Sequence, residues 1–236
     1  MSARPARSGC AGTPGRLTDV GAVRQSGRVP TTLRIALEQG RTKVFASALD
    51  WPGWSRWGGS DEAAIDELLA YAERYAVVAV RAGARFPASF DVTVVERTPG
   101  TTTTDFGAPA VPAAADLDPP RAPDLARQVG LMRASWALFD EVVASAPATL
   151  RKGPRGGGRD RDDVVAHVHE AERAYARKVG VRHPPFREPG SLEAMRTDLA
   201  AALVSGSAAG DWPVPYAIRR ITWHVLDHLW EIQDKS

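Results

Sequence analysis

Two histidines near the end of the sequence have the spacing of a metal-binding pair. They are His224 and His228, in the segment ITWHVLDHLWEIQDK that runs from Ile221 to Lys235. Side chains four residues apart lie on one face of a helix, close enough to chelate a single ion. The same spacing also occurs in helices whose histidines only pack or form a hydrogen bond with a neighbour. A metal site and a packing role are therefore both open for this pair.

A third histidine for a metal site comes from an earlier helical segment. His167 flanks the apolar stripe of the sequence DDVVAHVHEAERAY, whereas His169 lies further from the centre of that stripe. His183 falls in a proline-rich loop and is a weaker candidate. Of these three, His167 is the best placed to face the helix that carries the histidine pair.

Together, His167, His224 and His228 would supply three imidazole nitrogens from two helices. Imidazole suits zinc, nickel, copper and iron, and we expect zinc or nickel here. Three protein ligands leave one position for water or a substrate, which is the arrangement of a catalytic zinc rather than a structural one. The histidine set therefore predicts a divalent metal site that could activate a bound molecule.

A ligating histidine usually donates its second N–H to a carboxylate or a carbonyl. Glu231, Glu170 and Asp227 are all available by spacing, and spacing alone does not decide among them. We take Glu231 as the first choice for this supporting role or for proton transfer. No Gly-x-Ser-x-Gly elbow and no phosphate-binding loop ending in Gly-Lys-Ser/Thr occurs in the sequence, so these hydrolase and nucleotide-binding classes are not indicated.

The composition is that of an ordinary globular protein, with 44% hydrophobic and 25% charged residues among 236. The formal net charge of +2 is misleading, because residues 1–30 carry a net charge of +4 and the remainder carries −2. We expect these 30 residues to be a disordered basic tail, and we do not expect the rest to bind nucleic acid. No apolar run reaches the length of about 18 residues that would predict a membrane helix. The single cysteine, Cys10, fits a reducing cytoplasm.

The histidines must be positioned by secondary structure, and the hydrophobic patterns of the sequence predict two structured parts. Residues 31–98 alternate between strand-like and helix-like segments, which predicts a small α+β unit: an antiparallel sheet with one helix. WPGWSRWGGS within it is expected to be turn-rich. Residues 99–120 are rich in Pro, Ala and Thr and read as a linker. Residues 121–236 are expected to form an all-α antiparallel four-helix bundle.

The four helices are expected near residues 122–146, 160–180, 190–206 and 214–234. Two phrases in this half, DDVVAHVHEAERAY and RRITWHVLDHLWEIQD, resemble the DinB-like superfamily of four-helix bundles. The resemblance implies a three-histidine metal site at His167, His224 and His228, and some members are thiol S-transferases. Many members place the second ligand of the pair one turn later, where this sequence has Ile232. Either His228 has that role or the site is degenerate.

The segment VFASALDWPGWSRWGGSDEAAIDELLAYAERY resembles the HicB-like antitoxin fold over residues 31–98. The resemblance implies a fold more than an activity, because no DNA-binding module follows. The leading hypothesis is a cytoplasmic metal-dependent thiol S-transferase or hydrolase acting on a small-molecule thiol or another small substrate. The alternative is a non-enzymatic interaction or regulatory module with a degenerate bundle. A homodimer is left open, and no membrane partner is expected.

Overall fold

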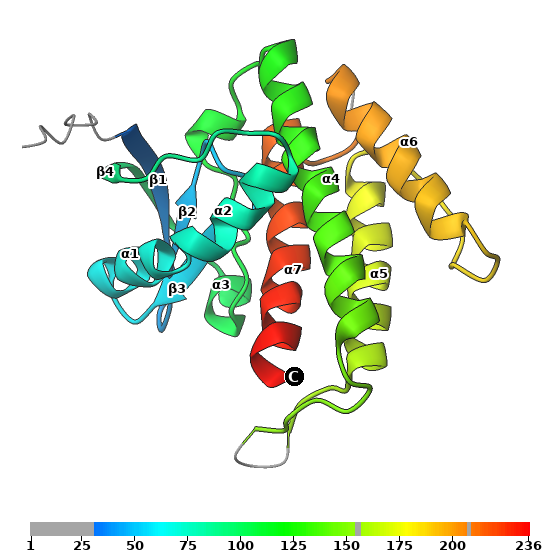
Figure 1. Ribbon diagram of the computed structural model, residues 1–236. Coiled ribbons are helices and arrows are strands. Elements are labelled where there is room, and N and C mark those ends of the chain that lie inside the picture. Colours follow the sequence, from blue (N-terminus) through cyan, green and yellow to red (C-terminus); the bar gives the residue numbers. More distant parts are fainter. Residues whose placement is uncertain (1–30, 154–156, 207–208) are drawn as a thin grey trace, which may run out of the picture.

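The computed structural model describes residues 31–153, 157–206 and 209–236, so the tail predicted over residues 1–30 lies outside the described part. A four-stranded sheet with two covering helices comes first, and a set of helices follows it (Figure 1). The first part contains β1 (Thr31–Gln39), β2 (Val44–Ala48), β3 (Ser55–Gly58), α1 (Asp61–Ala70), α2 (Ala72–Arg81) and β4 (Phe90–Pro99). The second contains α3 (Thr102–Phe106), the 3-10 turn η1 (Ala114–Asp116), α4 (Ala122–Ser145), α5 (Arg161–Lys178), α6 (Ser191–Ser205) and α7 (Val214–Lys235).

The sheet is mixed, which corrects the prediction of an antiparallel sheet. Its strand order is β3-β2-β1-β4, and β1 pairs antiparallel with β2 but parallel with β4. The reason lies in the connection, because α1 and α2 intervene between β3 and β4. A helical crossover returns the chain to the same end of the sheet, so the next strand runs parallel to the one before the crossover.

The stretch predicted to be turn-rich contains β3, which the sequence analysis missed. This strand has only four residues and pairs with β2 from Val44 opposite Gly58 to Ser47 opposite Ser55. The turn before it uses Gly53 with φ of 87°, and a Cβ there would lie 2.5 Å from Cγ2 of Thr222 in α7. Gly53 is therefore required both by the backbone conformation and by the close approach of α7.

The single helix predicted after the sheet turn is two helices, α1 and α2, separated at Tyr71. The Ser60 side chain accepts a hydrogen bond from the Ala63 N–H and caps α1. Tyr71 leaves the helical conformation, and its ring packs edge-on against Trp230 of α7 with centroids 4.9 Å apart. The break allows α1 to pack against β2 and β3 while α2 packs against α4.

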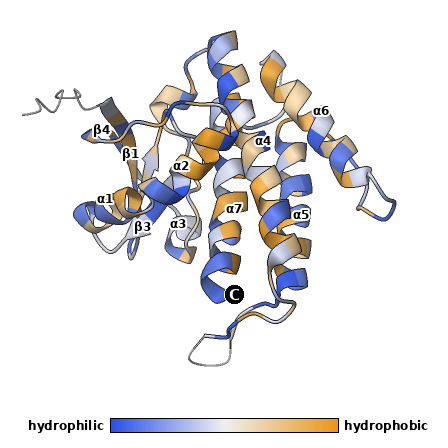
Figure 2. Cartoon of the chain, viewed as in Figure 1, coloured by the Kyte–Doolittle hydropathy of each residue, from blue (hydrophilic) through white to orange (hydrophobic). Residues whose placement is uncertain are grey.

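The four long helices predicted from the sequence are confirmed, each within two residues of its expected bounds. α4 packs against α6 and α7, and α5 packs against the same two helices. Hydrophobic and hydrophilic residues both occur along each long helix (Figure 2). None of the described helices combines the length and the apolarity needed to cross a membrane.

α7 lies between the sheet and the other long helices, and both sides cover it (Figure 1). On the sheet side, the Phe45 and Trp223 rings meet edge-on with centroids 6.0 Å apart. Leu33 of β1, Leu131 of α4 and Val225 of α7 belong to one continuous cluster of buried apolar side chains. The sheet part and the helical part therefore share a hydrophobic core.

The segment predicted as a linker, residues 99–120, has regular structure and fixed contacts. It carries α3 and η1. Asp116 of η1 accepts hydrogen bonds from the Arg219 guanidinium of α7, including one of 3.0 Å from Nε to Oδ1. Both side chains of this ion pair are buried. The segment is thus held against α7 by a buried ion pair, in addition to being joined to β4 and α4 at its ends.

We expect Arg219→Met to lower the free energy of unfolding by about 3–5 kcal/mol, because it leaves the Asp116 carboxylate buried without its cation. Adding Asp116→Asn should recover part of that loss, since the uncompensated charge is then removed. Urea denaturation of both variants measures the two values. Arg121→Ala, which breaks the exposed pair with Asp124, is the control and should change stability little. Equal losses in the single and double variants would contradict the role assigned to the buried pair.

Candidate metal centre

α7 carries two of the three predicted ligands and has the local features of a long buried helix. Pro215 occupies its first turn, where a missing N–H costs nothing. Apolar side chains such as Ile221, Val225 and Ile232 are fully buried. His224 is buried and His228 is partly buried at the side of this apolar face. The helix therefore holds both imidazoles at the boundary between its core face and its acidic side.

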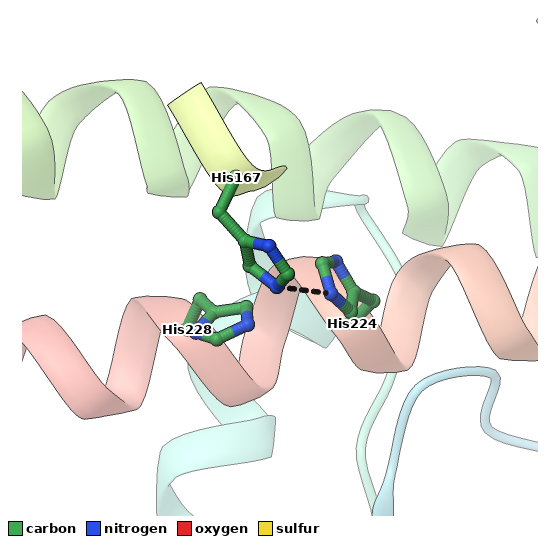
Figure 3. Close-up of side chains that lie close together, drawn as sticks. All are labelled: His167, His224 and His228. Carbon is green, nitrogen blue, oxygen red and sulfur yellow. Dashed lines mark hydrogen bonds between the residues drawn. The ribbon is translucent and has the colours of Figure 1, made fainter. Parts of the chain in front are cut away.

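α5 supplies the third imidazole, from His167. Acidic residues in the first turn of this helix and basic residues in the last turn, Arg177 and Lys178, complement its dipole. Val164 and Val168 are fully buried on its inner face. His167 lies next to them and points toward α7, where His224 and His228 point back (Figure 3).

The three imidazoles converge. The Nε2 atoms of His167 and His224 lie 3.2 Å apart, and one ring nitrogen from each of the three histidines falls within 4.8 Å of the others. Zinc–nitrogen bonds of about 2.0–2.1 Å in a tetrahedral site place two ligand nitrogens roughly 3.3 Å apart. The His167–His224 spacing already matches that value, and a His228 ring nitrogen lies within 4.8 Å of both.

Glu231 fixes the orientation of His228. Its Oε2 lies 2.6 Å from Nδ1 of His228, and its Oε1 accepts a hydrogen bond of 2.5 Å from Lys235. The hydrogen bond with His228 is the main cause that lowers the pKa of Glu231 to about 2. The carboxylate therefore holds the proton on Nδ1 and leaves Nε2 of His228 free as a ligand. Such a weak base favours the supporting role of Glu231 over a role in proton transfer near neutral pH.

His224 and His167 are disposed to stay uncharged. Burial lowers the pKa of His224 well below its usual value, and the neighbouring His228 and Arg220 lower it further. Burial also lowers the pKa of His167, and the neighbouring His228 adds to the effect. Nδ1 of His224 is buried and has no hydrogen-bond partner among the described residues. Neutral imidazole is the form that binds a metal, so both rings are ready to act as ligands.

The remaining candidates lie elsewhere. The His169 ring is near Phe139 and Phe186, and His183 is 2.9 Å from Asp198. These positions agree with the sequence-based choice of His167. Of the two other carboxylates with suitable spacing, Glu170 binds Arg173 and Asp227 binds Arg56. The structure thus selects Glu231 as the carboxylate beside the histidines.

The sequence analysis did not identify the aromatic and basic surroundings of the three histidines. The Tyr175 ring of α5 stands edge-on to His224 with centroids 5.5 Å apart, and it packs against Trp212. Arg220 precedes His224 by one turn of α7, and its guanidinium lies 5.0 Å from the centre of the Tyr175 ring. Arg220 could have been identified from the sequence, because it precedes His224 by the same four residues that separate His224 from His228.

Ile232 occupies the position where the resemblance placed an alternative ligand, and its side chain is fully buried among apolar groups. It lies in the core, whereas His228 faces His167 with ring centroids 4.9 Å apart. The geometry therefore favours His228 as the second member of the pair.

The chain was compared with protein-family models, with curated proteins and with solved structures. No family model matches it, and neither a curated protein nor a solved structure does. The DinB-like and HicB-like resemblances accordingly stay predictions, and the side-chain geometry is the basis for any functional conclusion.

Proposed function

We propose that this protein binds one divalent metal ion through His167, His224 and His228. The observation that carries the proposal is the convergence of three ring nitrogens from two helices within 4.8 Å. Zinc or nickel suits a set of three imidazoles. Nε2 of His224 already faces Nε2 of His167, and the Glu231 carboxylate on Nδ1 of His228 leaves Nε2 of that ring as the ligand atom.

The chemistry we propose is metal-assisted activation of a small thiol or of water. A bound divalent ion lowers the pKa of either molecule and so supplies a nucleophile near neutral pH. Thiol S-transfer is the first choice and hydrolysis is the second. The role of Glu231 is to keep His228 oriented, while Lys235 balances the charge of that carboxylate. The Tyr175 ring, which packs against Trp212, supplies an aromatic surface beside His224.

The pairwise packing of α4, α5, α6 and α7 supports a bundle of the DinB-like type as the frame of this site. In such a bundle, facing helices project ligands inward from fixed positions. α5 and α7 have that relation here. The sheet part, which we compare with the HicB-like fold, supplies the other wall around α7.

Protein purified without a histidine tag should contain about one zinc or nickel per chain. His224→Ala should abolish this metal, because two imidazoles cannot replace the three-ligand set. Elemental analysis by mass spectrometry measures the content. His169→Ala and His183→Ala are matched controls, since both remove a histidine outside the cluster, and both should retain the metal.

Metal-free protein should also become more stable when zinc or nickel is added, by about 2.7 kcal/mol at a free concentration of 100 times the Kd. A thermal transition that does not move with either ion would overturn the proposal. That result would favour the non-enzymatic alternative, in which the three histidines only pack.

Glu231→Gln should weaken metal binding by about 10- to 100-fold, because His228 loses the anionic partner that holds its proton on Nδ1. Competition with a fluorescent chelator measures the affinity. Glu170→Gln changes an exposed glutamate of α5 that pairs with Arg173, and it should leave the affinity unchanged. An equal loss of metal affinity in both variants would show that the affinity depends on the overall negative charge and not on the hydrogen bond between Glu231 and His228.

Zinc-loaded protein should accelerate the reaction of 2-mercaptoethanol with 1-chloro-2,4-dinitrobenzene, in which a C–S bond forms and chloride and a proton leave. His224→Ala should return the rate to the uncatalysed background. Hydrolysis of 4-nitrophenyl acetate tests the second choice in the same preparation. If neither rate exceeds that of free zinc in buffer, the metal has no catalytic role of the proposed kind.

A further inference from the structure

Arg220 is a buried arginine without a carboxylate partner in the described part of the chain. Its exposed fraction is 9%, and Nη1 has no hydrogen-bond partner among the described residues. The other buried arginines of the described part, Arg196 and Arg219, are each bound to at least one carboxylate. A buried charge without a counter-ion is costly. The fold therefore maintains a free guanidinium donor at this point of α7.

Two aromatic rings hold this guanidinium in place. It lies 4.6 Å from the centre of the Trp223 ring and 5.0 Å from that of Tyr175. These contacts are cation–π interactions, which use the flat face of the group and leave its N–H donors available at the edge. Trp223 contacts the sheet through Phe45, whereas Tyr175 belongs to α5. Arg220 is thus fixed between the sheet and α5.

A small cavity adjoins Arg220. Its volume is about 20 Å³, and its lining includes Ser47, Ser55 and Tyr216. This is room for one or two water-sized groups, such as the two oxygens of a carboxylate. The two serine hydroxyls bind each other at 2.8 Å, so they do not satisfy the guanidinium.

Glu38 also lines this cavity, and its carboxylate is already bound. It accepts hydrogen bonds from the backbone N–H groups of Ala110 and Val111 and from the hydroxyl of Thr104. No ion pair joins it to Arg220 in the described part of the chain. A role for Arg220 as a distant counter-charge to Glu38 is the competing explanation, and it predicts no ligand.

The position of Arg220 relative to the histidines indicates what it would bind. Tyr175 touches both sites, since its ring is 5.5 Å from that of His224. Arg220, His224 and His228 follow one another at four-residue intervals on one side of α7, so Arg220 is about one helical turn, roughly 6 Å, from the first ligand. A short molecule with an anionic group two or three bonds from its metal-binding atom suits two neighbouring groups that share contact with the Tyr175 ring.

We propose that Arg220 binds the carboxylate of a small substrate whose other end, on the proposed function above, reaches the ion held by the three histidines. Arginine matches a carboxylate with two parallel N–H donors. The substrate class is therefore a short molecule with a thiol or a comparable metal-binding atom at one end and a carboxylate at the other.

The test uses the full chain and a matched pair of probes, 3-mercaptopropionate and its uncharged amide, 3-mercaptopropanamide. Tryptophan fluorescence follows binding, because Trp223 and Trp212 lie beside the site. Wild-type protein should bind the carboxylate at least about 10-fold more tightly than the amide. Arg220→Met should bring the two affinities within about two-fold, and Arg220→Lys, which keeps the charge without the planar fork, should give an intermediate preference.

Arg127→Met is the matched control. Its guanidinium also lies over an aromatic ring, 4.4 Å from the centre of Trp51, but it belongs to α4 and donates a hydrogen bond to the Asp50 carbonyl. This variant should keep the full preference for the carboxylate. A wild-type protein that does not distinguish the two probes would overturn the proposal even if Arg220→Met failed to fold, and so would an Arg220→Met protein that kept the preference.

Zinc-loaded and metal-free protein are both titrated, so that this proposal and the proposed function can fail separately. Zinc content should be about one per chain in wild type and in Arg220→Met, since Arg220 is not a ligand. If wild type takes up no zinc but still prefers the carboxylate, the metal proposal fails and the role of Arg220 stands. If zinc binds but no preference is seen, the role of Arg220 fails and the metal proposal stands.

Discussion

The burial of α7 on nearly all its sides is the constraint on which the rest of this structure depends. The sheet covers one side through Phe45, α4 and α5 cover another, and η1 attaches through the Asp116–Arg219 pair. An α-helix satisfies its own backbone, so burying it costs little provided that its polar side chains find partners. Each polar side chain that faces inward on α7 therefore requires an explanation.

The inward-facing polar side chains of α7 differ in whether they have a partner. Arg219 is neutralised by Asp116, and His228 is held by Glu231. His224 and Arg220 are exceptions, because each keeps a buried nitrogen without a partner among the described residues. The two exceptions are neighbours, one turn apart on one side of the helix. Their proximity is the reason for proposing that the three histidines and Arg220 serve one substrate.

The parts of the structure that the sequence could predict are those set by local pattern. The long helices follow from apolar residues at helical spacing, and His167 was preferred to His169 because only His167 flanks the inner stripe. The break at Tyr71 could not be predicted in this way, because it depends on Trp230, which is distant in the sequence. The parallel pairing of β4 and the burial of Arg220 likewise depend on how separate elements meet. A local pattern contains no information on such contacts.

The order of the elements along the chain has a consequence for biosynthesis. α7 follows every other described element, yet the sheet part and the other long helices both pack against it. While the ribosome still covers this segment, the apolar surfaces that α7 will later cover face solvent. His167 is synthesised earlier, so it can contact His224 and His228 only after α7 has been made. The shared core and the arrangement of the three histidines should therefore form together, once α7 has left the ribosome, and an arrest of synthesis before α7 would leave a chain with neither.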